Sequence, residues 1–310
     1  MKQYLLNTGK GDLHLVRDER ELENIQPDDR VITLMTTDEF QQDAPVPHKS
    51  GLTGSIRHHS MSKVETYSDS LQGVVRVPHR SAGSMSSQSF GFSLQPDRLF
   101  FIDDTDFLAE RFRQMERDPL GTCSLTYFLL TVLGLFIGDD VVYLERLEKK
   151  LMKIEENLLH KMPNSFYATI IDYRKELTAL RAFYEQLVNM ADQIRAAIEH
   201  DLIPKEQSAW QIFSGRCERL HSHVEMLAEY LLQIRELYQS QIDIQQNRVM
   251  TFLTIVTTVF MPLTLITGWF GMNFPDMYLL RQPWGYPLVL FLSVVIVIAE
   301  CIYFRDKKML

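Results

Sequence analysis

The apolar positions of the chain change their spacing from the N-terminus to the C-terminus. Short β-type runs separated by polar loops lie at Val31–Met35, Val74–Val77 and Phe90–Ile102, the last one broken at Gln95–Arg98. From about Asp118 onward, apolar residues recur at steps of three and four, which is the spacing of an amphipathic helix. We therefore expect an α/β region at residues 1–117 and a helical region at residues 118–248.

Three long amphipathic helices are predicted in the helical region. Their apolar stripes are Leu144–Leu158, Ile170–Leu187 and Leu220–Tyr238. No Gly or Pro stands between Arg216 and Pro262, so the third helix is expected to continue as one rod into the apolar segment that follows it. An earlier apolar run, Leu125–Ile137, has only 13 residues, which predicts a buried helix rather than a membrane span.

Two stretches in the N-terminal region have the composition of loops. Pro45–Lys63 and His79–Ser93 are rich in Ser, Gly, Pro and His. Because these residues are typical of turns, both stretches are predicted to be surface loops.

Two segments near the C-terminus are long and uncharged enough to cross a membrane. Val249–Phe270 has 22 residues, which extend about 33 Å as a helix against a hydrocarbon core of about 30 Å. Tyr286–Phe304 has 19 residues, and its single formal charge, Glu300, lies one turn from the end, where its carboxylate is expected to reach water. We predict two transmembrane helices, 249–270 and 286–304, joined by an extracytoplasmic loop, 271–285.

The charges beside these spans predict their orientation. The basic residues next to the spans are Arg248, Arg305, Lys307 and Lys308, the last three in the tail 305–310. The connecting loop balances Arg281 against Asp276. Since positive charge marks the cytoplasmic side, we expect a multi-pass protein of the inner or plasma membrane with both termini in the cytoplasm.

Composition and motifs narrow the classes of function. The 310 residues include 40 acidic and 32 basic side chains, a formal net charge of −8, which offers no basic field for binding nucleic acid. The three cysteines, Cys123, Cys217 and Cys301, lie far apart and do not have the CxxC spacing of a metal site. The chain contains no nucleophile elbow, HExxH pair or phosphate loop, so we expect neither an enzyme nor an ATP-driven pump, and no cofactor.

The first predicted span carries a stripe of small, hydroxyl, amide and thioether side chains. Its members, at steps of three and four, are Asn247, Met250, Thr254, Thr257, Met261, Thr264 and Gly268. Two interpretations fit this stripe: a seam where small residues let helices approach each other, or a pore wall that faces water. Two spans cannot enclose a channel, so a pore wall requires several copies assembled around an axis.

The end of the first span and the loop after it resemble a known family. Phe260–Met277 reads FMPLTLITGWFGMNFPDM and contains the triplet Gly271, Met272 and Asn273. The entry to the second span reads WGYP at residues 284–287, and Lys307 and Lys308 follow the span in the basic tail. The chain thereby resembles the CorA family of magnesium channels, closely over about the last 65 residues and by helix order back to about Asp118. Ser62–Pro78 is also similar to a strand region of the family's α/β domain.

The resemblance implies an α+β membrane protein: a homopentamer in the lipid bilayer, with the first span lining the pore and a cytosolic α/β/α domain. By position, Asn247, Met250, Met261 and Thr264 face the pore.

The same resemblance places Asn273, with Gly271 and Met272, at the outer mouth as the selectivity site, where Asn273 meets the ion through hydration water. An amide suits that place because its neutral oxygen releases the ion more readily than a carboxylate would. Asp276 either raises the local cation concentration or is a solvated loop residue.

The resemblance does not extend to the family's cytosolic metal-sensing carboxylates. They have no clear match, because the chain reads SGRCER at Ser214–Arg219, where members usually have an Asp-rich stretch.

We expect Mg²⁺ as the transported ion, driven inward by the membrane potential, with Co²⁺ and Ni²⁺ as secondary ions and with a regulatory role of Mg²⁺ left open. The alternatives are a ZntB-like zinc transporter, from a branch that usually replaces the methionine retained here as Met272, and a non-conducting, membrane-anchored metal sensor.

Overall fold

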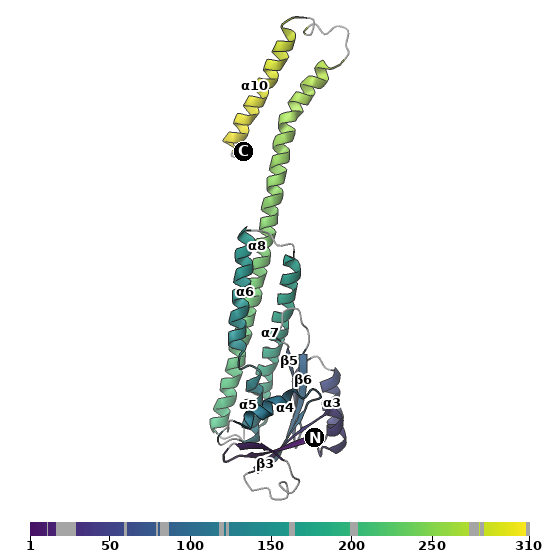
Figure 1. Ribbon diagram of the computed structural model, residues 1–310, viewed down its shortest axis with the longest axis vertical. Helices are drawn as coiled ribbons and strands as arrows, with labels where there is room; N and C mark the ends of the chain where they lie inside the picture. Colours follow the sequence, from purple (N-terminus) through teal and green to yellow (C-terminus); the bar gives the residue numbers. More distant parts are fainter. Residues whose placement is uncertain are drawn as a thin grey trace. The chain divides into compact units, whose positions relative to one another are not determined.

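The protein consists of two compact units, Met1–Ile234 and Arg235–Leu310. The computed structural model describes residues 1–10, 12–16, 29–58, 61–78, 80, 87–117, 121, 124–160, 165–198, 204–272, 279 and 282–307. Helix α8 (Pro204–Phe270) begins in the first unit and ends in the second without interruption, which confirms the predicted continuous rod (Figure 1).

The first unit is built on a mixed β-sheet. Its strands are β1 (Lys2–Asn7), β2 (Asp12–Leu15), β3 (Asp29–Met35), β4 (Lys63–Thr66), β5 (Leu71–Pro78), β6 (Ser87–Leu94) and β7 (Arg98–Ile102). Their order is β2-β1-β3-β7-β6-β5-β4, with β3 and β7 parallel and every other neighbouring pair antiparallel. The three predicted β-type runs fall in β3, in β5 and in the β6–β7 hairpin.

The other helices are listed here by their bounds. They are α2 (Thr37–Asp43), α3 (Lys49–His58), α4 (Phe107–Met115), α5 (Leu125–Leu135), α6 (Asp140–His160) and α7 (Phe166–Ala197) in the first unit, and α10 (Gly285–Asp306) in the second. The three predicted amphipathic stripes lie in α6, α7 and α8.

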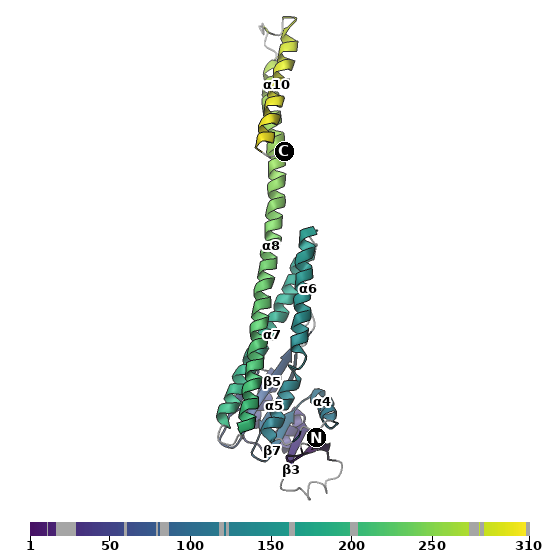
Figure 2. The same cartoon turned by 90° about the vertical axis from the view of Figure 1, so that its left-hand side faces the viewer.

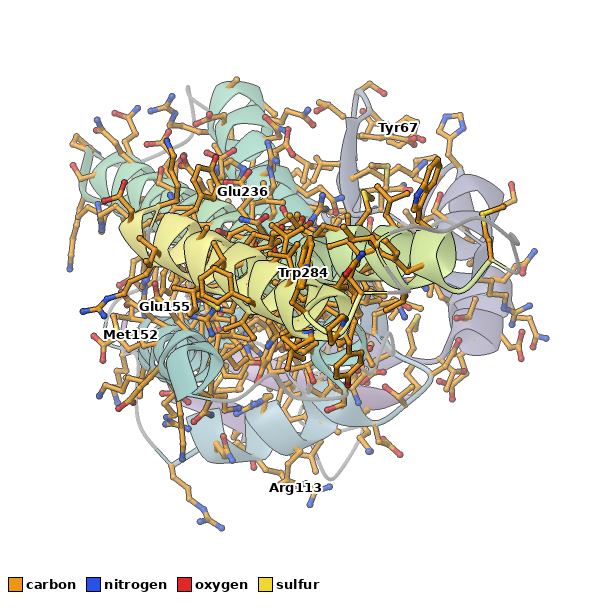
Figure 3. The ribbon with its side chains drawn as sticks, turned by 90° about the horizontal axis from the view of Figure 1, so that it is seen from above. Tyr67, Arg113, Met152, Glu155, Glu236 and Trp284 are labelled. Carbon is orange, nitrogen blue, oxygen red and sulfur yellow. The ribbon has the colours of Figure 1, made fainter. Side chains whose placement is uncertain are left out.

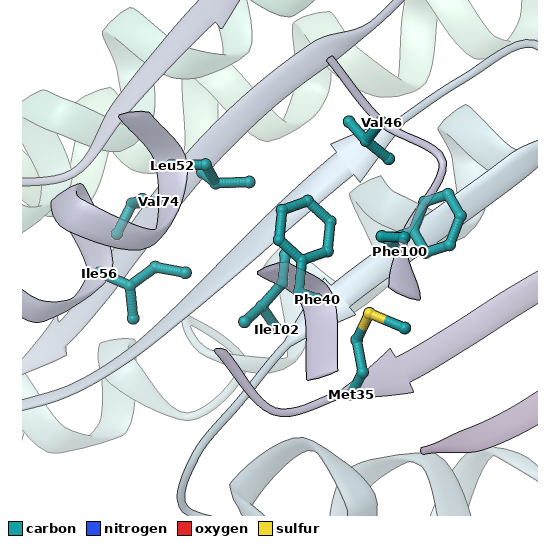
Figure 4. Close-up of a cluster of buried hydrophobic side chains, with 9 residues drawn as sticks. Met35, Phe40, Val46, Leu52, Ile56, Val74, Phe100 and Ile102 are labelled. Carbon is teal, nitrogen blue, oxygen red and sulfur yellow. The ribbon is translucent and has the colours of Figure 1, made fainter. Parts of the chain in front are cut away.

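Helices α2 and α3 cover one face of the sheet. Phe40 of α2 and Ile56 of α3 lie in a buried cluster with Phe100 and Ile102 of β7 (Figure 4). Gly91 in β6 lets α3 approach closely, because a Cβ atom there would lie 2.5 Å from the Cδ1 atom of Ile56. The contact between this helix and the sheet therefore depends on a missing side chain.

Helices α4 and α5 cover the opposite face. Phe101 points away from Phe100 and Ile102, as alternate residues of a strand do. The centroid of its ring lies 5.3 Å from that of Phe112 in α4 and 6.3 Å from that of Phe128 in α5, both edge-to-face. The three layers form the α/β/α arrangement that the family resemblance implied.

The apolar run at residues 125–137 is a core helix, as its length predicted. The buried residues of α5 are Leu125, Phe128, Leu129, Leu130, Val132 and Leu133. By length and composition Leu125–Leu158 is apolar enough to cross a membrane, but α5 ends before α6 begins, and 50% of its apolar window is buried in the protein. The corresponding buried share is 0% in α8 and 6% in α10, so among the described helices only these two have the surface of a membrane span.

Both predicted surface loops are partly wrong. Within 45–63, residues Lys49–His58 form α3, whose Leu52 and Ile56 are buried against the sheet. Within 79–93, residues from Ser87 onward belong to β6. Ser and Gly suggested turns, but a few apolar residues between them suffice to hold an element when a neighbouring layer buries them. Residues 59–60, 79 and 81–86 lie outside the described part of the chain.

A buried ion pair joins the sheet to the helices of the first unit. Asp140 directly follows the α5–α6 turn (Phe136–Asp139) and is completely buried. One of its carboxylate oxygens accepts a hydrogen bond from the Arg80 guanidinium, just beyond β5, and the other accepts one from the Tyr184 hydroxyl of α7 at 2.8 Å. Burial and the neighbouring Asp140 charge raise the pKa of Tyr184, so this hydroxyl stays a donor.

The α5–α6 turn is held from two further directions. Arg80 also donates to the backbone carbonyl of Phe136. From the other side, Arg216 of α8 donates to the carbonyls of Ile137 and Gly138 at 3.1 and 2.8 Å. One short turn thus connects the end of β5 with the helix that continues into the second unit.

Replacing Asp140 with Ala is expected to lower the free energy of unfolding by about 3 kcal/mol, because the Arg80 cation and the Tyr184 hydroxyl lose their buried partner. Replacing Glu110 with Ala removes only an exposed ion pair to Arg113 and should cost less than about 1 kcal/mol. Chemical unfolding of the full chain followed by circular dichroism measures both values. Equal costs for the two variants would contradict the structural role of Asp140.

The Cys217 thiol is expected to be chemically inert in the folded protein. Burial raises its pKa to about 12, so at pH 8 almost none of the reactive thiolate is present. In a chain with Cys123→Ser and Cys301→Ser, maleimide labelling at pH 8 should be negligible in the native state and complete after unfolding. Rapid native labelling would show that Cys217 is accessible.

Candidate functional site

The second unit carries two helices with exposed apolar surfaces, the end of α8 and α10. Phe252, Leu265 and Phe291 are each more than 65% exposed. A surface of this kind is stable against lipid or against other protein copies, but not in water. These helices contain the two predicted spans.

One face of α8 packs against α10. Between residues 251 and 270, the partly covered residues of α8 are Thr251, Ile255, Val256, Val259, Pro262, Leu263, Ile266 and Phe270. The covered or partly covered residues of α10 are Gly285, Val289, Ser293, Ile296, Val297, Glu300 and Phe304. Each set lies along one side of its helix, and α10 lies beside the end of α8 in both views (Figures 1 and 2). The two spans therefore form an antiparallel hairpin.

Glu300 belongs to the covered stripe of α10. Its Oε2 atom is buried and has no hydrogen-bond partner among the described residues. The expectation that the Glu300 carboxylate reaches water is therefore wrong for this oxygen, because the side chain lies on the face of α10 that packs against α8.

The polar stripe predicted in the first span lies on the other side of α8. All seven members, Asn247, Met250, Thr254, Thr257, Met261, Thr264 and Gly268, are exposed. At 100° per residue, the stripe is centred nearly opposite the face that packs against α10. It is therefore not the seam of the hairpin, and its surroundings are lipid, water or other copies.

A shallow hollow lies along this stripe. Thr257, Met261, Thr264 and Gly268 form its floor together with Met272, and Phe260, Leu265 and Trp269 flank them. Sequence reasoning missed the flanking residues, because large apolar side chains are equally typical of a surface that faces lipid.

The threonine hydroxyls of the stripe are oriented by their own helix. Thr254 donates to the Met250 carbonyl at 2.8 Å, Thr257 to the Leu253 carbonyl at 2.7 Å, and Thr264 to the Phe260 carbonyl at 2.7 Å. With the hydrogen engaged, each hydroxyl oxygen keeps lone pairs that can only accept. The stripe is thus a row of acceptors, which suits cations and the outward-pointing hydrogens of their bound water.

Gly271 and Met272 end α8 in a tight turn. The Gly271 amide donates to the Thr267 carbonyl at 2.8 Å, and the Met272 amide donates to the Trp269 carbonyl at 3.4 Å. A Cβ atom on residue 271 would lie 2.7 Å from that same Thr267 oxygen, so only glycine fits here. Asn273 and Asp276 lie outside the described residues, as does most of the loop 271–285.

The stretch Ser214–Arg219 packs within the first unit. Arg216 holds the α5–α6 turn, Cys217 is buried, and Ser214 donates to Asp192 at 3.5 Å. Among the described residues, no group of three or more His, Cys, Asp or Glu side chains is arranged to hold a metal ion. This part of the chain therefore serves packing and the support of a turn.

Comparison with known proteins agrees with this architecture. Residues 34–308 match the family described as "CorA-like Mg2+ transporter protein". The cobalt/magnesium transport protein CorA of Thermotoga maritima is 29% identical over 215 residues, which cover 67% of this chain and 59% of that protein. The magnesium transport protein CorA of Haemophilus influenzae is 34% identical over 224 residues, 71% of each chain.

A solved structure shares the fold over almost the whole length. The complete structure of the CorA magnesium transporter from Methanocaldococcus jannaschii matches with a TM-score of 0.76 and 20% identity, over 98% of both chains. The match to the family covers most of the chain, from the sheet to the end of the second apolar helix. The chain therefore belongs to the CorA-like Mg²⁺ transporter family.

Proposed function

We propose that this protein is a channel for the passive uptake of hydrated Mg²⁺, with Co²⁺ and Ni²⁺ as secondary ions. The observation that carries the proposal is the row of oriented acceptors on the face of α8 that its own hairpin leaves uncovered. Family membership supports the choice of Mg²⁺. The name of the Thermotoga maritima relative, which includes cobalt, supports Co²⁺.

Several copies must assemble to make a pore from this face. One hairpin of two helices encloses no channel, and the exposed stripe needs partners around an axis. We propose a homopentamer in the inner or plasma membrane, with α8 of each copy facing the axis and α10 outside it. Both termini then lie in the cytoplasm, as the basic flanks Arg248 and Arg305 indicate.

The acceptor row suits a cation that keeps its water. Mg²⁺ usually retains several of its bound waters, whose hydrogens point outward. The hydroxyl oxygens of Thr254, Thr257 and Thr264 accept such hydrogens without replacing the waters. Neutral acceptors bind weakly, and conduction needs binding that is strong enough to admit the ion and weak enough to release it.

The outer mouth is proposed to be a ring of Asn273 amides, the residue that follows the tight turn at Gly271 and Met272 in the sequence. Asp276 of each copy adds negative charge near that mouth. The membrane potential supplies about 2.3 kcal/mol per charge per 100 mV, so a divalent cation gains about 4.6 kcal/mol on moving inward. A passive channel therefore suffices for uptake.

Replacing Asn273 with Ala is expected to reduce Mg²⁺ uptake at least tenfold, because the amide ring that receives the hydrated ion is lost. Uptake is measured in proteoliposomes with an inside-negative potential of about 100 mV. Gln282→Ala, which removes another amide of the same loop, should leave uptake within about twofold. Unchanged flux in Asn273→Ala would refute the proposed role of this residue.

The double substitution Thr257→Val and Thr264→Val is expected to reduce the same flux several-fold, because valine keeps the shape and removes the acceptor oxygens. Thr258→Val is the matched control, since Thr258 also donates to a carbonyl one turn earlier but lies off the stripe. It should change the flux by less than about twofold. Equal effects of the two changes would mean that the stripe does not line the pore.

A further inference from the structure

A cavity of about 540 Å³ lies in the first unit, away from the proposed pore. It is formed where the end of β5 and the start of β6 meet α4 and the α5–α6 turn. Its volume is within the range of about 300 to 1,000 Å³ that is typical of small-molecule sites. The transport function proposed above does not use this cavity.

Four charged side chains line the cavity: the ion pair Arg80–Asp140, and Arg111 and Asp139, which form no ion pair with each other. Asp140 uses both carboxylate oxygens for Arg80 and Tyr184, so that pair is internal to the fold. Arg111 of α4 also lines the cavity, is only partly exposed, and forms no ion pair with another described residue. The fourth charged group, Asp139, is exposed. A cation that is partly shielded from water is thus available to an anionic group.

Two aromatic rings form part of the apolar wall of the cavity, beside Val77, Pro78 and Leu135. The rings of Phe107 and Phe136 are stacked, with centroids 5.2 Å apart and planes inclined by 25°. Phe136 is buried, whereas Phe107 is partly exposed. Such a surface favours a flat, apolar ligand body over a bare inorganic ion.

We propose that this cavity binds a small organic anion of the nucleotide type. The anionic group pairs with Arg111, the flat ring lies against Phe107 and Phe136, and hydroxyl or amino groups donate to Asp139. The opposite charges of Arg111 and Asp139 favour a ligand that carries both an acceptor end and donor groups. Inorganic phosphate alone satisfies only one of these three features.

A ligand in the cavity contacts the same turn that α8 supports. Phe136 and Asp139 line the cavity, and Arg216 of α8 donates to the two carbonyls between them. A change in the position of this turn on binding is therefore transmitted to α8, whose distal part carries the acceptor stripe. The cavity is thus a regulatory site, although its ligand binding does not depend on the proposed transport function.

Binding is tested by titrating the full chain in detergent micelles with adenosine 5′-monophosphate in a calorimeter. We expect saturable binding at millimolar or lower concentrations, and binding at least tenfold weaker for both adenosine and inorganic phosphate. Absence of saturable binding of the nucleotide would overturn the proposal. Equal binding of inorganic phosphate would overturn the role of the aromatic wall.

The substitution Arg111→Gln should weaken nucleotide binding at least tenfold. Arg113→Gln is the matched control, because Arg113 lies two residues away in α4 and stands at the outer edge of the molecule in Figure 3. Its side chain is 63% exposed and pairs with Glu110. It should bind within about twofold of the parent chain, and circular dichroism verifies that both variants are folded. Equal affinity of the two variants would overturn the assignment of Arg111.

Coupling to α8 has a separate readout. Nucleotide binding should slow amide hydrogen exchange in the α5–α6 turn and in α8 near Arg216. In Arg216→Gln, the nucleotide should still bind within about threefold, but the added protection in α8 should be lost. Protection of α8 that persists in this variant would overturn the proposed connection and leave the binding site itself standing.

Discussion

Backbone hydrogen bonds hold α8 as one helix from Pro204 to Phe270, and both units contain part of it. Within hydrocarbon every backbone polar group must be bonded inside the segment or by a neighbour, and a helix meets this requirement over its whole length. The first part of the same helix packs in the first unit, where Trp210, Leu220 and Ile234 are buried. Pro262 removes one backbone donor, yet the helix continues for two more turns.

The two faces of α8 in the second unit have different tasks. One face packs against α10 with branched apolar residues such as Ile255 and Leu263, and the opposite face presents the stripe. Threonine suits that stripe because its hydroxyl is satisfied by the helix itself and still offers an acceptor outward. A serine or threonine in this state adds polarity to an apolar helix without leaving a donor unsatisfied.

In the first unit, side chains from two other elements donate hydrogen bonds to the backbone of one short turn. The α5–α6 turn lies between Arg80 and Arg216, which approach its carbonyls from the sheet side and from α8. Arg216 stands within the stretch where acidic residues were expected from the family resemblance, and it binds backbone rather than metal. In our proposals the chain thus combines a transmembrane hairpin with a regulatory site for an organic anion, in place of clustered carboxylates.

The sequence by itself determined the long elements. Periodicity identified α6, α7 and α8, length separated the buried α5 from the spans in α8 and α10, and the absence of Gly and Pro predicted the uninterrupted rod. These features are local, because they depend on spacing and length along one segment. The short elements β1, β2, α2, α3 and α4 were not predicted, because none is longer than ten residues and each forms only when another layer covers it.

Only the tertiary structure decided which side of α8 the hairpin covers, and therefore that the stripe is not its seam. It alone brought Arg80, Asp140, Tyr184 and Arg216 to one turn, and Arg111 to the cavity beside it. The tertiary structure also explains two glycines. A Cβ atom at Gly91 would collide with Ile56 of α3, and a Cβ atom at Gly271 would collide with the Thr267 carbonyl at the end of α8. Hydrophobic periodicity records which side of a segment avoids water, but it does not record which other segment or ion arrives there, because that depends on contacts between residues far apart in the chain.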